Sequence, residues 1–153
     1  MNVVRLTKIV QVVRLWDFFK EGIQYEAKYL RYAYPMEVYH RILFHLVRSN
    51  PNGWVSVAFN DDEEPIAFIM AHDITPLFSQ IREFEVSMFY YRDGYKTAMP
   101  LLQKSFDTFC RDNHIRQYFL SSSSFCSSAT RVFKTSWLGL ERSNTVFKRI
   151  INK

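Results

Sequence analysis

The segment Met88–Lys104 has the residue types and spacing to bind a phosphate group. It predicts a strand that passes through a tight turn at Gly94 into an amphipathic helix. Such a turn can aim several backbone N–H groups, together with the positive end of the helix dipole, at one point. An anionic group is the ligand that this arrangement favours.

Two carboxylates precede this turn at a spacing suited to proton transfer. Glu83 and Glu85 lie two positions apart in a segment predicted to be a strand, so both side chains face the same side. A carboxylate near a bound amine can take up its proton, directly or through a water molecule. A solvated strand face is the alternative interpretation of the same pattern.

The elements that position these groups follow from the spacing of apolar residues. Apolar runs predict strands over residues 3–6, 54–59, 65–72, 82–90 and 115–120, and a final strand pair over 138–151 turned near 143–144. Three- and four-residue spacing predicts helices over 7–22, from Pro35 to the stop at 50–53, after Gly94, and beyond the polar turn 121–128. The order is β-α-α-β-β-β-α-β-α-β-β without an internal repeat, so we expect one domain spanning residues 1–153.

The same patterns predict which side chains are buried. Gly22 is expected to end the first helix. The strand 82–90 alternates apolar and polar residues, which places Met88 on one face with Phe84 and Val86. The helix after Gly94 is expected to turn four apolar side chains inward, namely Leu101, Leu102, Phe106 and Phe109.

Composition predicts a folded protein outside the membrane. The 153 residues are 48% apolar and 17% aromatic, which is enough for a single core and excludes the disordered class. The net charge of +5 fits an anionic partner or an ordinary basic surface. No apolar stretch is long enough to span a bilayer. Because Cys110 and Cys126 make no disulfide framework, we expect a soluble, cytoplasmic protein.

Several other chemistries lack their sequence signatures. No zinc-binding spacing is present, and neither a Ser-His-Asp motif, a Walker loop nor a dinucleotide fingerprint is visible. Lysine and arginine do not cluster on one predicted helix face, so nucleic acid ranks last among the candidate partners. The four histidines are scattered, at His40, His45, His72 and His114. Because no zinc-binding spacing relates them, we expect no metal.

Over nearly the whole chain, this order of elements resembles the GNAT (Gcn5-related) N-acetyltransferase fold. An N-terminal strand and two helices precede an antiparallel hairpin, a fourth strand leads into a helix, and a fifth strand follows at 117–121. The resemblance implies an α/β fold with a mixed, mostly antiparallel central sheet, splayed strands four and five, and about four flanking helices. In that family coenzyme A lies in the splay, and its pyrophosphate rests on the loop before the helix.

The family's loop pattern, Arg/Gln-x-x-Gly-x-Gly/Ala, is matched in part. With Leu101 and Leu102 set on the family's helix leucines, Asp93 takes the Arg/Gln position, Lys96 the first glycine and Ala98 the second small residue. A shift by one residue places Arg92 in the first position instead. The resemblance implies acetyl-CoA as cofactor, with contacts from Met88, Phe89, Tyr90, Arg92, Gly94, Tyr95, Lys96, Thr97, Ala98, Ser121 and Ser128.

A second family marker covers the helix after strand five. The family has Asn, then Ala, then a Tyr that often protonates the departing thiolate; here Cys126, Ala129 and Phe133 take these positions. Because phenylalanine has no hydroxyl, a tyrosine near the loop is expected to replace it, with Tyr91 as the candidate acid. Aromatic packing around the turn is the alternative. Glu85 is the candidate base, since it is nearer the splay than Glu83.

The resemblance leaves two functions open. The first is an N-acyltransferase that moves an acetyl group from acetyl-CoA to a primary amine, on a small molecule or a protein, by direct attack. The second is a catalytically inactive GNAT-like protein that acts as a binding or structural component, of phage or mobile-element origin. Self-association is compatible with both. Tyrosines on the expected acceptor side, among them Tyr25 and Tyr34, are candidate groove residues.

Overall fold

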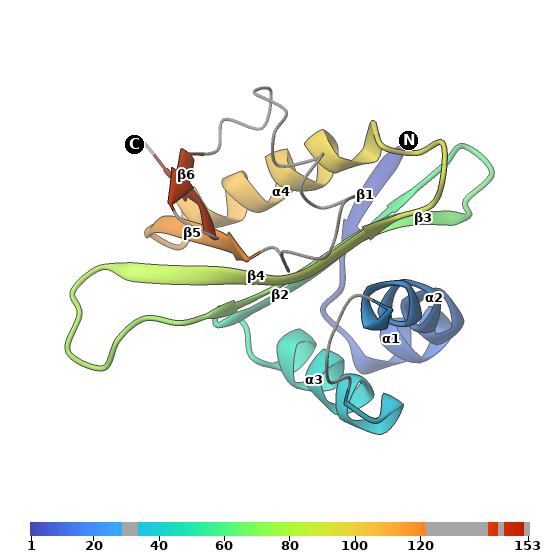
Figure 1. Ribbon diagram of the computed structural model, residues 1–153, viewed down its shortest axis with the longest axis horizontal. Helices are drawn as coiled ribbons and strands as arrows, with labels where there is room; N and C mark the ends of the chain where they lie inside the picture. Colours follow the sequence, from blue (N-terminus) through green and yellow to red (C-terminus); the bar gives the residue numbers. More distant parts are fainter. Residues whose placement is uncertain (29–33, 122–140, 144–145, 152–153) are drawn as a thin grey trace.

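The residues that the structure describes form a seven-stranded mixed sheet with helices on both faces (Figure 1). This computed structural model describes residues 1–28, 34–121, 141–143 and 146–151. The strands are β1 (Asn2–Arg5), β2 (Gly53–Phe59), β3 (Pro65–Asp73), β4 (Arg82–Tyr91), β5 (Ile115–Ser121), β6 (Glu141–Ser143) and β7 (Val146–Ile150). The helices are α1 (Ile9–Arg14), α2 (Trp16–Ala27), α3 (Met36–Arg48) and α4 (Ala98–Asp112).

The sheet is mostly antiparallel, as predicted. Its strand order is β1-β2-β3-β4-β5-β7-β6, and among the described strands β4 and β5 form the single parallel pair. The predicted hairpin is β2–β3, and the predicted final strand pair is β6–β7. Helix α4 lies on one face of the sheet, and α1, α2 and α3 lie on the other (Figure 1).

Each face of the sheet has its own apolar layer. On the α4 face, Leu102, Phe106 and Phe109 are buried, as their spacing predicts. Leu101 is 39% exposed, so its predicted inward position is wrong; it lies beside the buried stripe of α4. Because helices cover both faces, the central residues of β2 and β3 are buried. In the described ranges, no helix combines the length and apolar content needed to cross a bilayer.

Gly22 does not end a helix, contrary to the sequence prediction. Helix α2 continues to Ala27, and Gly22 lies buried within it. A Cβ at this position would lie 2.5 Å from Cε1 of Phe68 and 2.8 Å from Cγ of Tyr90. The glycine therefore serves close packing of α2 on β3 and β4, and not chain reversal.

A β-bulge interrupts β4 at Ser87. Met88 pairs with Met70 of β3, and Val86 pairs with the next residue, Ala71, so Ser87 is an additional residue in β4. Because of this extra residue, Met88 packs with the layer on the α1–α3 face and not with Val86, so its predicted face is wrong. A single inserted residue exchanges the two faces of every residue that follows.

The bulge coincides with the point where β4 and β5 separate. Their parallel pairing ends at Val86 and Leu120, whereas pairing of β4 with β3 continues to Tyr91. The predicted splay of strands four and five is therefore confirmed. Extra local twist, which a bulge produces, is a physical reason for the strands to part here.

Candidate functional site

The second half of β4 is the first part of the candidate site. Among the described strands, residues 88–91 pair only with β3, so the other edge of β4 faces the gap toward β5. Met88 and Tyr90 pack on the α1–α3 side of this segment, and Phe89 packs on the α4 side. The predicted strand contacts, Met88, Phe89 and Tyr90, thus lie on the part of β4 that an extended ligand could follow, as does the predicted acid, Tyr91.

Beyond this edge, the turn into α4 presents unused backbone donors. Gly94 has a φ of 86°, and the turn is closed by hydrogen bonds from Tyr95 N–H to Arg92 O (3.0 Å) and from Ala98 N–H to Tyr95 O (2.9 Å). Within the described residues, the N–H groups of Gly94, Lys96 and Thr97 have no acceptor. These donors point to an anion site of the predicted kind.

The start of α4 supports the same interpretation. Thr97 is the N-cap residue, its side chain makes no capping hydrogen bond, and the first turn carries no acidic residue. Ala98 is fully buried, and Lys96 is exposed beside the turn. The positive end of a 15-residue helix is thus available to a negatively charged group, which fits a pyrophosphate.

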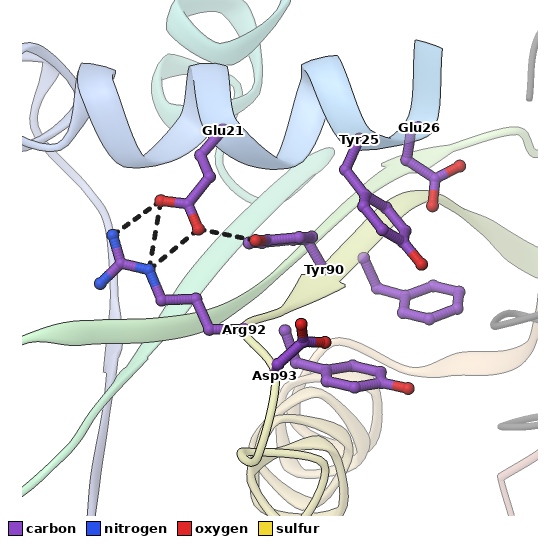
Figure 2. A pocket seen from close by; sticks show the side chains of 8 residues that line it. Glu21, Tyr25, Glu26, Tyr90, Arg92 and Asp93 are labelled. Carbon is purple, nitrogen blue, oxygen red and sulfur yellow. Dashed lines mark hydrogen bonds and ion pairs between the residues drawn. The ribbon is translucent and has the colours of Figure 1, made fainter. Parts of the chain in front are cut away.

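Arg92 lies at the β4 end of the turn, where its side chain pairs with a carboxylate of α2 (Figure 2). Its Nη2 lies 2.7 Å from Oε2 of Glu21, and its Nε lies 3.0 Å from Oε1. The guanidinium also donates to the carbonyl of Pro65 (2.9 Å) and lies 4.9 Å from the ring centre of Phe18. The predicted contact of Arg92 with phosphate stays a prediction, and making it would require exchange of Glu21 for phosphate.

Glu21 also accepts a hydrogen bond of 2.6 Å from the hydroxyl of Tyr90. The hydrogen bond from Arg92 lowers the pKa of Glu21, with a smaller opposing effect of burial. Burial, together with the hydrogen bond to Glu21, raises the pKa of Tyr90 well above its ordinary value. Tyr90 is therefore a structural hydrogen-bond donor here, and a poor candidate for the acid.

A cavity of about 290 Å³ lies between α2 and the end of β4. Figure 2 shows its walls: Glu21, Tyr25 and Glu26 come from α2, and Tyr90, Arg92 and Asp93 from the end of β4 and the start of the turn. Phe89 and Tyr91 complete the lining. Burial raises the pKa of Glu26. The cavity thus places Tyr25, a predicted groove residue, and Tyr91, the predicted acid, around one space.

The two glutamates of this cavity predict opposite effects of pH on stability. The pKa of Glu21 is below 4.5 in the folded state, so its contribution is present above pH 4.5 and is lost as the pH falls through the folded value. Glu21→Gln should therefore destabilise at pH 7, by about 1 kcal/mol because both partners are more than a third exposed, and the destabilisation should shrink as the pH falls through the folded value.

Glu26→Gln is the matched control for that prediction. The raised pKa of Glu26 means that its ionised form is disfavoured in the folded protein. Glu26 therefore destabilises the fold more as the pH rises through the pKa that it has in the folded state. The variant should be no less stable than the wild type at pH 7. Urea denaturation at pH 7 and pH 3 measures both, and equal effects of the two variants at pH 7 would contradict this assignment.

A larger groove of about 780 Å³ lies on the α3 side of the sheet, beside the bulge. Its helix wall includes Val38, Ile42 and Leu46, and its sheet wall includes His72 and Ser87. Arg41, His45, Asn52 and Asp73 also line it. An apolar helix wall facing polar side chains on the strands is a typical composition for a ligand site.

Three polar side chains meet at this groove. Nδ1 of His72 lies 2.6 Å from Oγ of Ser87, and Nε2 lies 3.8 Å from Oε2 of Glu85. Glu85 and His72 are direct partners in the β3–β4 register, and Ser87 lies two residues beyond Glu85, on the same face. The predicted base, Glu85, is thus brought next to an imidazole, whereas Glu83 accepts a hydrogen bond from Gln117 of β5.

His72 and Ser87 were missed by the sequence predictions. They lie 15 residues apart, and no linear motif relates them. The register of the β3–β4 hairpin, together with the bulge, brings them into contact. Only the pairing of His72 with Glu85 could have been found, by extending the predicted hairpin register to the next strand.

Some of the remaining predicted site residues belong to the described part of the chain, and others lie outside it. Ser121 ends β5, one residue beyond the last β4–β5 pair, and Tyr34 is 67% exposed. Ser128, Cys126, Ala129 and Phe133 lie outside the described residues. Among the residues that are described, no group of three or more His, Cys, Asp or Glu could hold a metal ion.

Neither a family model nor a curated protein matches this sequence. Solved structures do match. A probable acetyltransferase from Staphylococcus epidermidis has a TM-score of 0.73 and 14% identity, over 99% of each chain. A GNAT-family acetyltransferase from Staphylococcus aureus has a TM-score of 0.67 and 12% identity, over 99% of this chain and 100% of that one.

A ribosomal-protein-alanine N-acetyltransferase from Brucella melitensis biovar Abortus matches with a TM-score of 0.63 and 12% identity, over 88% of this chain and 89% of that one. Identities this low show the fold alone. The chain has the mixed α/β fold of the GNAT acetyltransferases, as a divergent example of it.

Proposed function

We propose that the protein is an N-acyltransferase that moves an acetyl group from acetyl-CoA to a primary amine. One observation carries this proposal: β4 and β5 part at Ser87, and residues 88–91, which pair only with β3 among the described strands, lead from the Ser87–His72–Glu85 cluster to the open donors before α4. An extended thioester lying along β4 would have its phosphates at one end and its reacting carbon near polar side chains at the other. Both ends of such a substrate therefore meet suitable groups.

The reaction is a direct attack of the amine on the thioester carbonyl. The amine nitrogen forms a bond to the carbonyl carbon, the C–S bond breaks, and coenzyme A leaves as a thiolate. The proton of the amine goes to the cluster that contains Glu85. The thiolate takes its proton from water, because the predicted acid, Tyr91, lies four residues beyond Ser87 along β4, at the end proposed for the phosphates. Residues Gly94, Lys96 and Thr97 would bind the pyrophosphate through backbone N–H groups, and residues 88–91 the pantetheine arm.

The names of two structural neighbours support an amine as the class of acceptor, but they do not identify the acceptor of this chain. One is named as a ribosomal-protein-alanine N-acetyltransferase, and another, at 12% identity and a TM-score of 0.67, as an aminoglycoside acetyltransferase from a soil metagenome. The first name describes N-acetylation of a protein, and the second describes acetylation of an aminoglycoside, which is a small molecule. A cytoplasmic location stays a prediction, as does a phage origin.

Binding of coenzyme A tests the proposal before any acceptor is known. We expect coenzyme A, acetyl-CoA and desulfo-CoA each to raise the melting temperature, since a ligand that binds only the folded state stabilises it by RT ln(1 + [L]/Kd). Adenosine at the same concentration is the control without the pyrophosphate. No shift and no calorimetric heat at millimolar coenzyme A would overturn the proposal.

A catalytically inactive binding protein is the second candidate. Two observations favour it: Glu21 holds Arg92 through several hydrogen bonds, and Asp93 adds an exposed carboxylate beside the turn. Both reduce the positive charge available to a pyrophosphate. This candidate predicts a stoichiometric complex with a protein partner, or self-association, together with absence of coenzyme A binding in the same titration.

A further inference from the structure

We propose that His72 is the group that takes the proton from the attacking amine, and that Ser87 and Glu85 act as positioning residues for its imidazole. This inference rests on the proposed acetyl transfer and names the base within it. Neither the predicted motifs nor the structural neighbours assign a role to His72.

The position of His72 is the first argument. Its side chain lines the groove of about 780 Å³ beside the bulge, on the α3 face of the sheet. Ser87, which it contacts, is the residue at which β4 parts from β5. A base in this place lies between an acceptor in the groove and a thioester in the strand gap. His72 is about 40% exposed, so an incoming amine can reach it.

The contacts of the imidazole are the second argument. The 2.6 Å hydrogen bond between Nδ1 and Oγ of Ser87 fixes the orientation of the ring. The carboxylate of Glu85, 3.8 Å from Nε2, is too far for a hydrogen bond but close enough to stabilise the imidazolium that forms when the ring takes a proton. A base held by one neighbour and charge-stabilised by another is a recurring catalytic arrangement.

The chemistry of the two candidate bases is the third argument. Imidazoles in general change charge between about pH 5 and 8, whereas ordinary carboxylates do so near pH 4. A base works best when its pKa lies near the working pH, which favours an imidazole over a carboxylate at neutral pH. Glu85 then acts through His72, and not on the amine itself.

Other charged groups face the same groove and enter the pH dependence. Arg41 and His45 project from α3, and Asp73 follows His72 in β3. The carboxylate of Asp73 lies 2.9 Å from Nη2 of Arg82 and accepts a hydrogen bond from Thr75 N–H (2.7 Å), so its charge is compensated locally. Glu85 is therefore the anion with the strongest expected effect on His72.

The groove also indicates the class of acceptor. Its helix wall presents Val38, Ile42 and Leu46, which favour an apolar body, and the polar side chains lie at the sheet wall beside the strand gap. An amine carried on an apolar body would place its carbon skeleton on α3 and its nitrogen at His72. A polycationic acceptor fits this wall poorly, because Arg41 would oppose it.

The test compares His72→Asn with His114→Asn. Asparagine can keep a hydrogen bond to Ser87 but cannot take a proton at neutral pH. We expect His72→Asn to lower kcat/KM for acetyl transfer about 100-fold or more, to leave the Kd for coenzyme A unchanged, and to remove the acid limb of the pH–rate profile. His114 is exposed, far in sequence from the site, and has a φ of 56° that asparagine tolerates well, so His114→Asn should behave as wild type.

A second variant separates a catalytic from a structural role. In Glu85→Gln the negative charge near the imidazole is lost while the shape of the side chain is kept, so we expect kcat to fall about 10-fold with the KM for the amine and the Kd for coenzyme A unchanged. A merely structural role would instead change binding or stability. Wild-type kcat in Glu85→Gln would contradict the positioning role of Glu85.

Three outcomes would overturn the inference. The first is a His72→Asn variant with wild-type rate and pH profile, which leaves the acetyl transfer intact but removes His72 from it. The second is an acetyl group on Ser87 in the intact-mass spectrum during turnover, which assigns the serine as a nucleophile. The third is absence of transfer by the wild type despite coenzyme A binding, which removes the proposed function and His72 together.

Discussion

Replacing Thr97 with aspartate should weaken coenzyme A binding about 100-fold or more while leaving the protein at least as stable as the wild type. Thr97 is the N-cap of α4, is exposed, and makes no capping hydrogen bond through its side chain. Aspartate is among the best N-cap residues and adds a favourable interaction with the helix dipole. The same carboxylate would occupy and repel the place where the pyrophosphate is proposed to bind. Calorimetric titration and thermal denaturation measure the two effects separately.

Thr97→Asn is the matched control for this prediction. It has nearly the shape of aspartate and caps a helix comparably well, but it carries no charge. Binding in Thr97→Asn should stay within a few-fold of the wild type, because only electrostatics distinguishes the two variants. Unchanged binding in Thr97→Asp would place the phosphates of coenzyme A away from α4.

Replacing Gly53 with alanine should destabilise the protein by about 3 kcal/mol, with a fall in melting temperature of about 10 °C. A Cβ at Gly53 would lie 2.2 Å from the carbonyl oxygen of Leu46 and 2.7 Å from its Cα. These are backbone atoms of α3, so relief requires movement of the whole helix and not of one side chain. Gly53 also pairs with His72, so the groove should be disturbed together with stability.

Gly94→Ala is the control for Gly53→Ala in urea denaturation. No atom lies within 4 Å of a Cβ built at Gly94, but its φ of 86° is unfavourable for alanine. We expect Gly94→Ala to lower the free energy of unfolding by about 1 kcal/mol, from backbone strain alone. Equal losses of stability in Gly53→Ala and Gly94→Ala would contradict a steric clash at Gly53.

The elements with a strong period were predictable from the sequence. The β2–β3 hairpin, the strand before Gly94 and the buried stripe of α4 all follow from apolar spacing, and their order indicated the fold. Gly22 was predicted wrongly because a glycine can either end a helix or allow close packing inside one. Which of the two it does depends on the residues packed against it, and these are not visible in the local sequence. For Gly22 those neighbours are Phe68 and Tyr90, on other elements.

The candidate site was predictable only in part. Alternation placed Glu83 and Glu85 on one face correctly, but it could not reveal the extra residue at Ser87. That bulge reverses the face of Met88. Ser87 keeps the face that alternation predicts for it, but its contact with His72 depends on the pairing of β3 with β4. The contact between Arg92 and Glu21 spans 71 residues and depends on how α2 lies on the sheet. Tertiary packing, and not local pattern, creates both arrangements.

Release of free thiol from acetyl-CoA, followed together with the mass of the acceptor, tests the central claim most directly. The account predicts that thiol appears only when a primary amine is present, that one acetyl group is gained by the amine for each thiol released, and that amines with an apolar body are preferred. Thiol release independent of amine, or no release at millimolar acetyl-CoA across a panel of aliphatic, aromatic and peptide amines, would contradict it.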